Sequence, residues 1–209
     1  MRKTLTLLST LAVAGLATTV AGTAAPNKAV TIKASRPIVV YGAAVTLSGK
    51  VAMPQSGEKV DVLADPYGSE GVNLIASVDT TAGGRWTFDA KPTIQTTYAA
   101  RWNGETSPTV GVKVRPAIKL VLGAISGRLG TFTTTATAAR AFAGKFVLVQ
   151  RLTSAGALIV KKVTLDSSSS ATFRVRLHTG RSRVRVVMPT SQAAPGYVTG
   201  FSNVLTVRR

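Results

Sequence analysis

Five arginines are concentrated in one short stretch near the C-terminus of the chain. A guanidinium presents a planar fork of N–H donors that matches the oxygens of phosphate and carboxylate groups, so a cluster of them favours an anionic partner. Because side chains alternate between the two faces of a strand, the arginines are expected to point outward and the intervening apolar residues inward. The alternative is a solvated surface whose charge only keeps the protein in solution. We predict an anionic-polymer-binding surface made of Arg174, Arg176, Arg181, Arg183 and Arg185.

Residues suited to catalysis or to metal binding are scarce. His178 is the only histidine and the chain has no cysteine, so neither a two-histidine metal site nor cysteine ligation is available. A Ser-His-Asp triad would need an acid beside His178, and the only acid after residue 116 is Asp166. Asp65–Gly71 lacks the dense carboxylates of a calcium loop, and Asp61 and Asp65 lie on one predicted strand with no evident cleft for glycoside cleavage. We therefore predict no catalytic, cofactor-binding or metal-binding residue, and a protein that is not an enzyme.

Aromatic side chains offer a different ligand chemistry, because an exposed ring can stack on the apolar face of a sugar. Trp102 ends a predicted strand, and Tyr67 and Tyr197 lie in predicted loops. Trp102 follows Tyr98 and Ala100 at a period of two, which instead predicts a place on the core face. A neutral-carbohydrate-binding module using these aromatics is the alternative function.

The first 25 residues have the layout of a secretory signal peptide. Basic residues at positions 2 and 3 precede an apolar, acid-free run over residues 5–20, and small residues follow it. Cleavage after Ala24 is favoured, because Pro26 would fit poorly next to the cut bond. An uncleaved membrane anchor is the alternative, although the run is shorter than the ~20 residues that a span needs. No later stretch is apolar enough to span a bilayer, so we predict a secreted, extracellular or cell-wall-associated protein.

The positive charge is divided unequally along the chain. The formal net charge is +18, and residues 26–115 hold 10 Lys and Arg against 7 Asp and Glu, whereas residues 116–209 hold 14 against 1. A strongly basic surface raises the encounter rate with any polyanion. We expect an anionic cell-envelope polymer or glycan as the partner. Nucleic acid is not expected, because export argues against it and no stacking aromatics alternate with the arginines.

The elements that must position these residues are repeated along the chain. Lys59 and Lys145 occupy similar blocks 86 residues apart, and Phe88 and Phe173 similar blocks 85 apart, which indicates two copies of one small domain. Each copy contains seven short alternating runs separated by turn residues, the pattern of a β-sandwich. The predicted strands fall near residues 29–34, 43–51, 58–65, 72–79, 84–90, 97–102 and 109–115, and near 117–122, 130–138, 145–152, 157–165, 171–178, 182–188 and 202–208.

The first copy contains several motifs: Val39–Gly42 before Val45–Gly49, then Gly83–Phe88 and Thr97–Gly104. Together these motifs resemble those of bacterial immunoglobulin-like domains. The second copy departs from this pattern, with Val184 where the first has Tyr98. The resemblance implies an all-β chain of two tandem seven-stranded immunoglobulin-like β-sandwiches, at residues 26–115 and 116–209, after a signal peptide at 1–25. Such domains imply a structural, adhesive or scaffold role at the cell envelope, with the second, basic domain contacting anionic polymers.

Overall fold

The computed structural model describes residues 29–208, which form seventeen strands and one helical turn, α1 (Thr190–Ala193). The predicted all-β class is confirmed. The signal peptide predicted for residues 1–25 lies outside the described residues. Among residues 29–208, no helix is both long and apolar enough to cross a bilayer.

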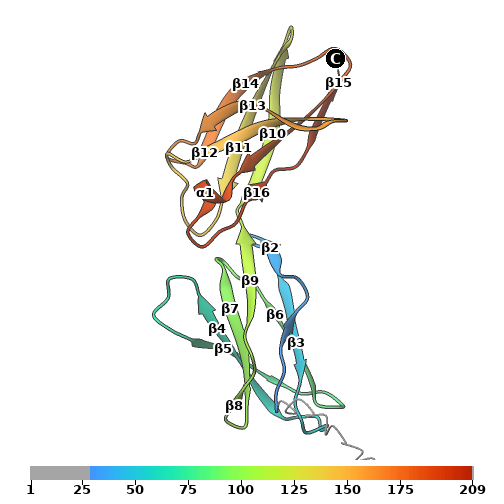
Figure 1. The fold of residues 1–209 in the computed structure, drawn as a ribbon, viewed down its shortest axis with the longest axis vertical. Helices are drawn as coiled ribbons and strands as arrows, with labels where there is room; N and C mark the ends of the chain where they lie inside the picture. The colour runs from blue at the N-terminus through green and yellow to red at the C-terminus, as the bar shows by residue number, and fades with distance from the viewer. Residues whose placement is uncertain (1–28, 209) are drawn as a thin grey trace, which may run out of the picture.

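The strands before Pro116 form two sheets, which we call the N-terminal sandwich (β1–β9; Figure 1). All their pairings are antiparallel except the one between β2 and β9. One sheet has the order β1 (Lys33–Ala34), β3 (Val45–Lys50), β6 (Arg85–Ala90). The other has the order β2 (Ile38–Val40), β9 (Val110–Arg115), β7 (Thr96–Trp102), β4 (Lys59–Pro66), β5 (Asn73–Asp79), with β8 (Glu105–Thr106) paired to β7.

The strands after Pro116 also form two sheets, the C-terminal sandwich (β10–β17), with the same central pairings. β11 pairs with β14 as β3 pairs with β6, and β12 lies between β13 and β15 as β4 lies between β5 and β7. The repeat visible in the sequence is therefore a repeat of topology. One sheet has the order β10 (Ala117–Ser126), β11 (Leu129–Thr137), β14 (Ser170–Arg176); the other has β13 (Gly156–Thr164), β12 (Phe146–Thr153), β15 (Arg181–Met188), β16 (Gly200–Phe201), with β17 (Leu205–Arg208) paired to β15.

The strand count differs from the seven predicted for each copy, being nine and eight. The first predicted strand, 29–34, keeps only β1 as a regular strand, and the chain then joins the opposite sheet as β2. Pro37 lies between them and has no N–H with which to continue the first ladder. The other additions, β8 and β16, are two residues long.

The alternation of side chains predicts the core well. Trp86 is buried between exposed Arg85 and Thr87. Phe173 and Val175 on β14 are buried, while Arg174 between them is exposed. The apolar faces of both sandwiches therefore point inward, and the basic residues are left on the outside.

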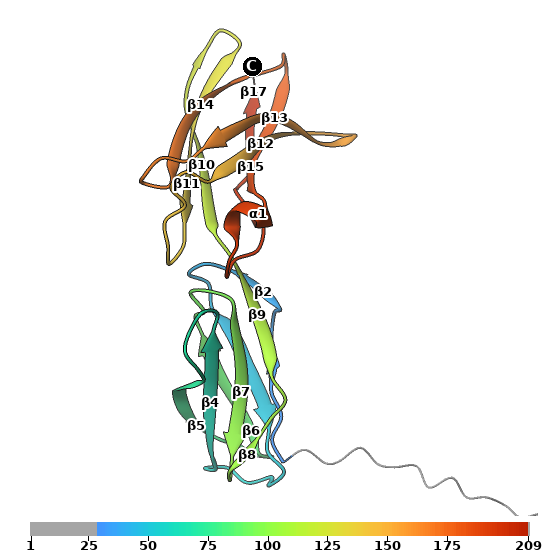
Figure 2. The same ribbon diagram turned by 60° about the vertical axis from the view of Figure 1, so that its left-hand side comes forward.

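The two sandwiches lie end to end and are joined by more than the Pro116 linker (Figures 1 and 2). The loop after α1 reaches back to the N-terminal sandwich, where the Tyr197 hydroxyl donates to the Thr93 carbonyl at 2.7 Å. The N–H of Gln95 also donates to the Gly196 carbonyl at 2.9 Å. Gly196 has φ +78°, and a Cβ there would stand 2.5 Å from the Ile94 side chain, so a larger residue would push the loop away. The junction is thus a bonded contact rather than a free hinge.

Candidate functional site

The arginines predicted to bind an anion lie on two opposite sheets. Arg174 and Arg176 are exposed on β14, in the three-stranded sheet, whereas Arg181 and Arg183 are exposed on β15, in the five-stranded sheet. β14 leads into β15 at the end of the sandwich remote from the junction (Figures 1 and 2). Arg176, Arg181 and Arg183 therefore lie at that end on two sheets and do not form one flat row.

Arg185 is placed differently from the other four. It is partly buried, its Nε donates to Oε1 of Gln150 at 2.8 Å, and its guanidinium lies 5.2 Å from the ring centre of Phe201. Arg115 contacts the same ring from 5.1 Å. Arg185 therefore supports packing near the junction, and the structure separates it from the other predicted arginines.

Two further arginines join this end of the sandwich from segments distant in sequence. Arg128 lies in the turn between β10 and β11, and Arg151 lies near the end of β12, with its Nη1 in contact with Nε2 of His178. The repeat alignment offers one signal for Arg151, because it stands where the first copy has Asp65. We define the basic tip as Arg128, Arg151, Arg176, His178, Arg181 and Arg183.

The basic tip encloses two adjacent hollows that share His178. One, of about 320 Å³, is lined by Arg151, Arg181 and Arg183 beside His178. The other, of about 290 Å³, is lined by Arg128 and Arg176 beside the same histidine. Each hollow therefore presents at least two guanidinium groups to whatever enters it.

Among the described residues of the C-terminal sandwich, one side chain carries a carboxylate. It is that of Asp166, which lies in the turn before β14 and accepts hydrogen bonds from Ser168 and Ser170. The Ser168 hydroxyl and the neighbouring backbone N–H groups lower the pKa of Asp166, which is committed to its own turn. Within residues 29–208, the ion pairs are Lys59–Asp79 and Arg101–Asp61, both in the N-terminal sandwich. The basic tip thus lacks an internal counter-ion among the described residues.

The aromatic residues of the alternative function do not form a sugar-binding platform. Trp102 is only 8% exposed and its Nε1 donates to Glu58, as expected for a core-face residue. The prediction of Tyr197 as an available loop aromatic is wrong, because it is 2% exposed and held in the junction. Tyr67 is 53% exposed but stands alone near Gly196.

The carboxylates considered for catalysis or calcium are held in structural contacts. Asp61 accepts from the Ser77 hydroxyl and from Arg101 at 2.8 Å, and these contacts lower its pKa. Asp65 accepts from Ser69 inside its own turn at 3.1 Å. Within the described part of the chain, no three His, Asp or Glu residues converge as a metal site would require.

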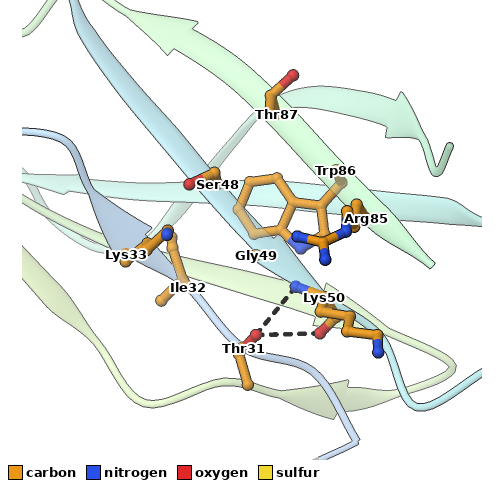
Figure 3. A pocket seen from close by; sticks show the side chains of 9 residues that line it. All are labelled: Thr31, Ile32, Lys33, Ser48, Gly49, Lys50, Arg85, Trp86 and Thr87. Atoms are coloured by element: carbon orange, nitrogen blue, oxygen red, sulfur yellow. Dashed lines mark hydrogen bonds between the residues drawn. The ribbon is translucent and has the colours of Figure 1, made fainter. Parts of the chain in front are cut away.

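Another hollow, of about 460 Å³, lies in the N-terminal sandwich over β1, β3 and β6 (Figure 3). Lys33, Lys50 and Arg85 line it, and the Trp86 indole lies over Gly49. Nε1 of Trp86 has no hydrogen-bond partner, but it is shielded from solvent and so is not presented to a ligand. The three cations of this hollow provide positions for a charge-matched control variant in the binding test proposed below.

Comparison with known proteins adds little about function. No protein-family model matches the chain, and no curated protein matches it. The chain is similar to a crystal structure of the tetra-tandem repeat in the extending region of a large adhesion protein, with 12% identity and a TM-score of 0.34. The match covers 85% of this chain and 48% of that one, so the chain spans about half its length. A likeness this distant carries no argument about what the chain binds.

Proposed function

We propose that this is a secreted, non-enzymatic protein of two tandem immunoglobulin-like domains, residues 26–115 and 116–209, with a structural, adhesive or scaffold role at the cell envelope. Export is supported by the signal-peptide pattern of residues 1–25. The domain type is supported by strand order: β3 pairs with β6, and β9, β7 and β4 are neighbours, as strands B–E and G–F–C are in an immunoglobulin sandwich.

The second domain contacts anionic envelope polymers, and the difference in charge between the domains carries this proposal. Both sandwiches have the same central topology, so the fold itself does not require the charge. The segment 116–209 nevertheless holds 14 Lys and Arg against one acid. The predicted contact residues are Arg174, Arg176, Arg181, Arg183 and Arg185.

The test is retention of the full chain on a purified cell-wall preparation at increasing salt. Binding through several cations releases counter-ions, so retention is expected to fall steeply between ~50 and ~200 mM salt. Changing the four exposed predicted arginines, Arg174, Arg176, Arg181 and Arg183, to Gln should abolish most retention at low salt. Arg185 is left unaltered because it packs against Phe201. Retention that does not change with salt would contradict the proposal.

A charge-matched variant of the N-terminal sandwich provides the control. Its four substitutions to Gln remove the same charge from exposed positions, three of which line the hollow of Figure 3. We expect this variant to be retained nearly as well as the unaltered chain. Equal loss in both variants would mean that net charge alone, and not the second domain, governs binding. The control positions are Lys33, Lys50, Arg85 and Lys113.

A further inference from the structure

The basic tip has features that net positive charge alone does not explain. Its cations come from the β10–β11 turn, from β12, from β14 and from β15, and they meet around one histidine. Arg181 and Arg208 lie directly opposite each other on β15 and β17. Like charges in directly opposed cross-strand positions are destabilising. A surface built this way gains from an external anion.

The shape of the tip selects among anions. Both oxygens of a planar carboxylate can be engaged by one bidentate guanidinium in a single plane, whereas a tetrahedral phosphate presents its oxygens in several directions. Each hollow supplies guanidinium groups from at least two segments of the chain, Arg151 and Arg183 in one and Arg128 and Arg176 in the other. Two adjacent hollows of this kind fit two successive groups of one chain better than a single small anion.

We infer that the basic tip binds a phosphate-bearing polymer, with successive phosphate groups in the two hollows and His178 between them. This inference rests on the proposed function, because it names the anion class and narrows the contact surface. Among the contact residues, Arg128 and Arg151 take the place of Arg174 and Arg185. Nη1 of Arg151 contacts Nε2 of His178, and His178 is the residue that lines both hollows.

A nucleic acid is the less suitable phosphodiester. Single-stranded nucleic acids are held by aromatic rings that stack on the bases as well as by cations that follow the backbone. Apart from His178, the side chains lining the two hollows include no aromatic ring. The tip therefore offers contacts to phosphates and none of the usual platforms for bases.

The experiment measures binding of the full chain to long-chain polyphosphate, by fluorescence anisotropy of the labelled polymer at several salt concentrations. The tip variant is Arg176→Gln with Arg183→Gln, which removes one exposed cation from each hollow. The control is Lys119→Gln with Lys161→Gln, which removes the same charge from exposed positions of the same sandwich outside the tip.

We expect the tip variant to bind polyphosphate about tenfold or more weakly, since each hydrogen bond to a charged group contributes strongly. The slope of log K against log salt should fall by about 1.4, for two phosphate contacts of roughly 0.7 each. The control should change binding less than about twofold. A second tip variant, Arg128→Gln with Arg181→Gln, repeats the measurement if the first does not fold.

Other outcomes separate the possible failures. Equal weakening of binding in the tip and control variants would show that the basic tip is not the binding surface. The proposed function would remain. Poly-glutamate binding as tightly as polyphosphate of equal charge would overturn the phosphate class. Tighter binding of single-stranded DNA, with dependence on its bases, would assign the tip to nucleic acid instead. No binding of any polyanion at low salt would overturn both this inference and the proposed function.

Discussion

Replacing Gly49 with Ala tests how closely β6 and the segment before β1 pack against β3 in the N-terminal sandwich. Gly49 lies opposite Trp86, whose indole lies over it (Figure 3). A Cβ at this position would stand 1.8 Å from the carbonyl oxygen of Thr31 and 2.7 Å from Nε1 of Trp86. Because the nearest atom is backbone, a strand must move to admit the methyl group. Overpacking of this kind costs about 1–3 kcal/mol, and a loss of about 2 kcal/mol lowers the Tm of a domain this size by roughly 10 °C.

The matched control is Gly111→Ala on β9. No atom lies within 4 Å of a Cβ built there, and the backbone does not need glycine. Ala at such a position stabilises by about 0.4–1 kcal/mol, because it restricts the unfolded chain. The two substitutions therefore have opposite expected signs on neighbouring parts of one sandwich.

Urea unfolding followed by tryptophan fluorescence measures both variants. The chain has two tryptophans, Trp86 and Trp102, both in the N-terminal sandwich, so their emission reports on that sandwich alone. The midpoint of Gly49→Ala should fall by about 1 M urea at a typical slope for a small domain. A midpoint equal to that of the unaltered chain, with the same slope, would refute the packing argument.

Three further outcomes are expected. Tyr197→Phe removes the hydroxyl bonded to Thr93, so it should lower Tm by roughly 5 °C and broaden the distance distribution in small-angle X-ray scattering; no change in either would contradict a bonded junction. The Ser77 hydroxyl and the Arg101 guanidinium lower the pKa of Asp61. The folding stability that these contacts contribute is therefore fully present above about pH 4 and is lost as the pH falls further. Asp61→Asn should therefore show a shallower fall of Tm between pH 5 and pH 2, and parallel curves would refute this. Neutral oligosaccharides should leave tryptophan emission unchanged because Trp102 is buried, and a saturable shift would restore the carbohydrate alternative.

The sequence predicts local features well because alternation is a local property. It places Arg174 and Arg176 outward, and Trp102 on the core face, from neighbours within a few residues. The burial of Tyr197 and the separation of Arg185 from the other arginines depend on contacts with distant residues. These residues are Thr93 for Tyr197 and Gln150 for Arg185, and no local pattern predicts either contact. Convergence of residues is the part of a site that sequence alone does not provide.

The same limit explains why the basic tip is only half visible in the sequence. Arg176, Arg181 and Arg183 fall in one dense stretch and are found by composition. Arg128 and Arg151 come from a turn and a strand end that the sandwich topology carries to the same place. A cation cluster in one stretch therefore indicates where to look, and the strand order determines which residues complete it.

The junction gives the position of the tip a functional meaning. The contact between Tyr197 and Thr93 and the Gln95–Gly196 hydrogen bond fix the C-terminal sandwich on the end of the N-terminal one. The tip lies at the opposite end of the C-terminal sandwich, and the described chain begins at the far end of the N-terminal sandwich (Figure 2). Under the proposed function, a contact surface at the end of a bonded tandem is held away from the start of the described chain, whereas a free hinge would let it fold back. The near-neutral sandwich then acts as a spacer that presents the basic one.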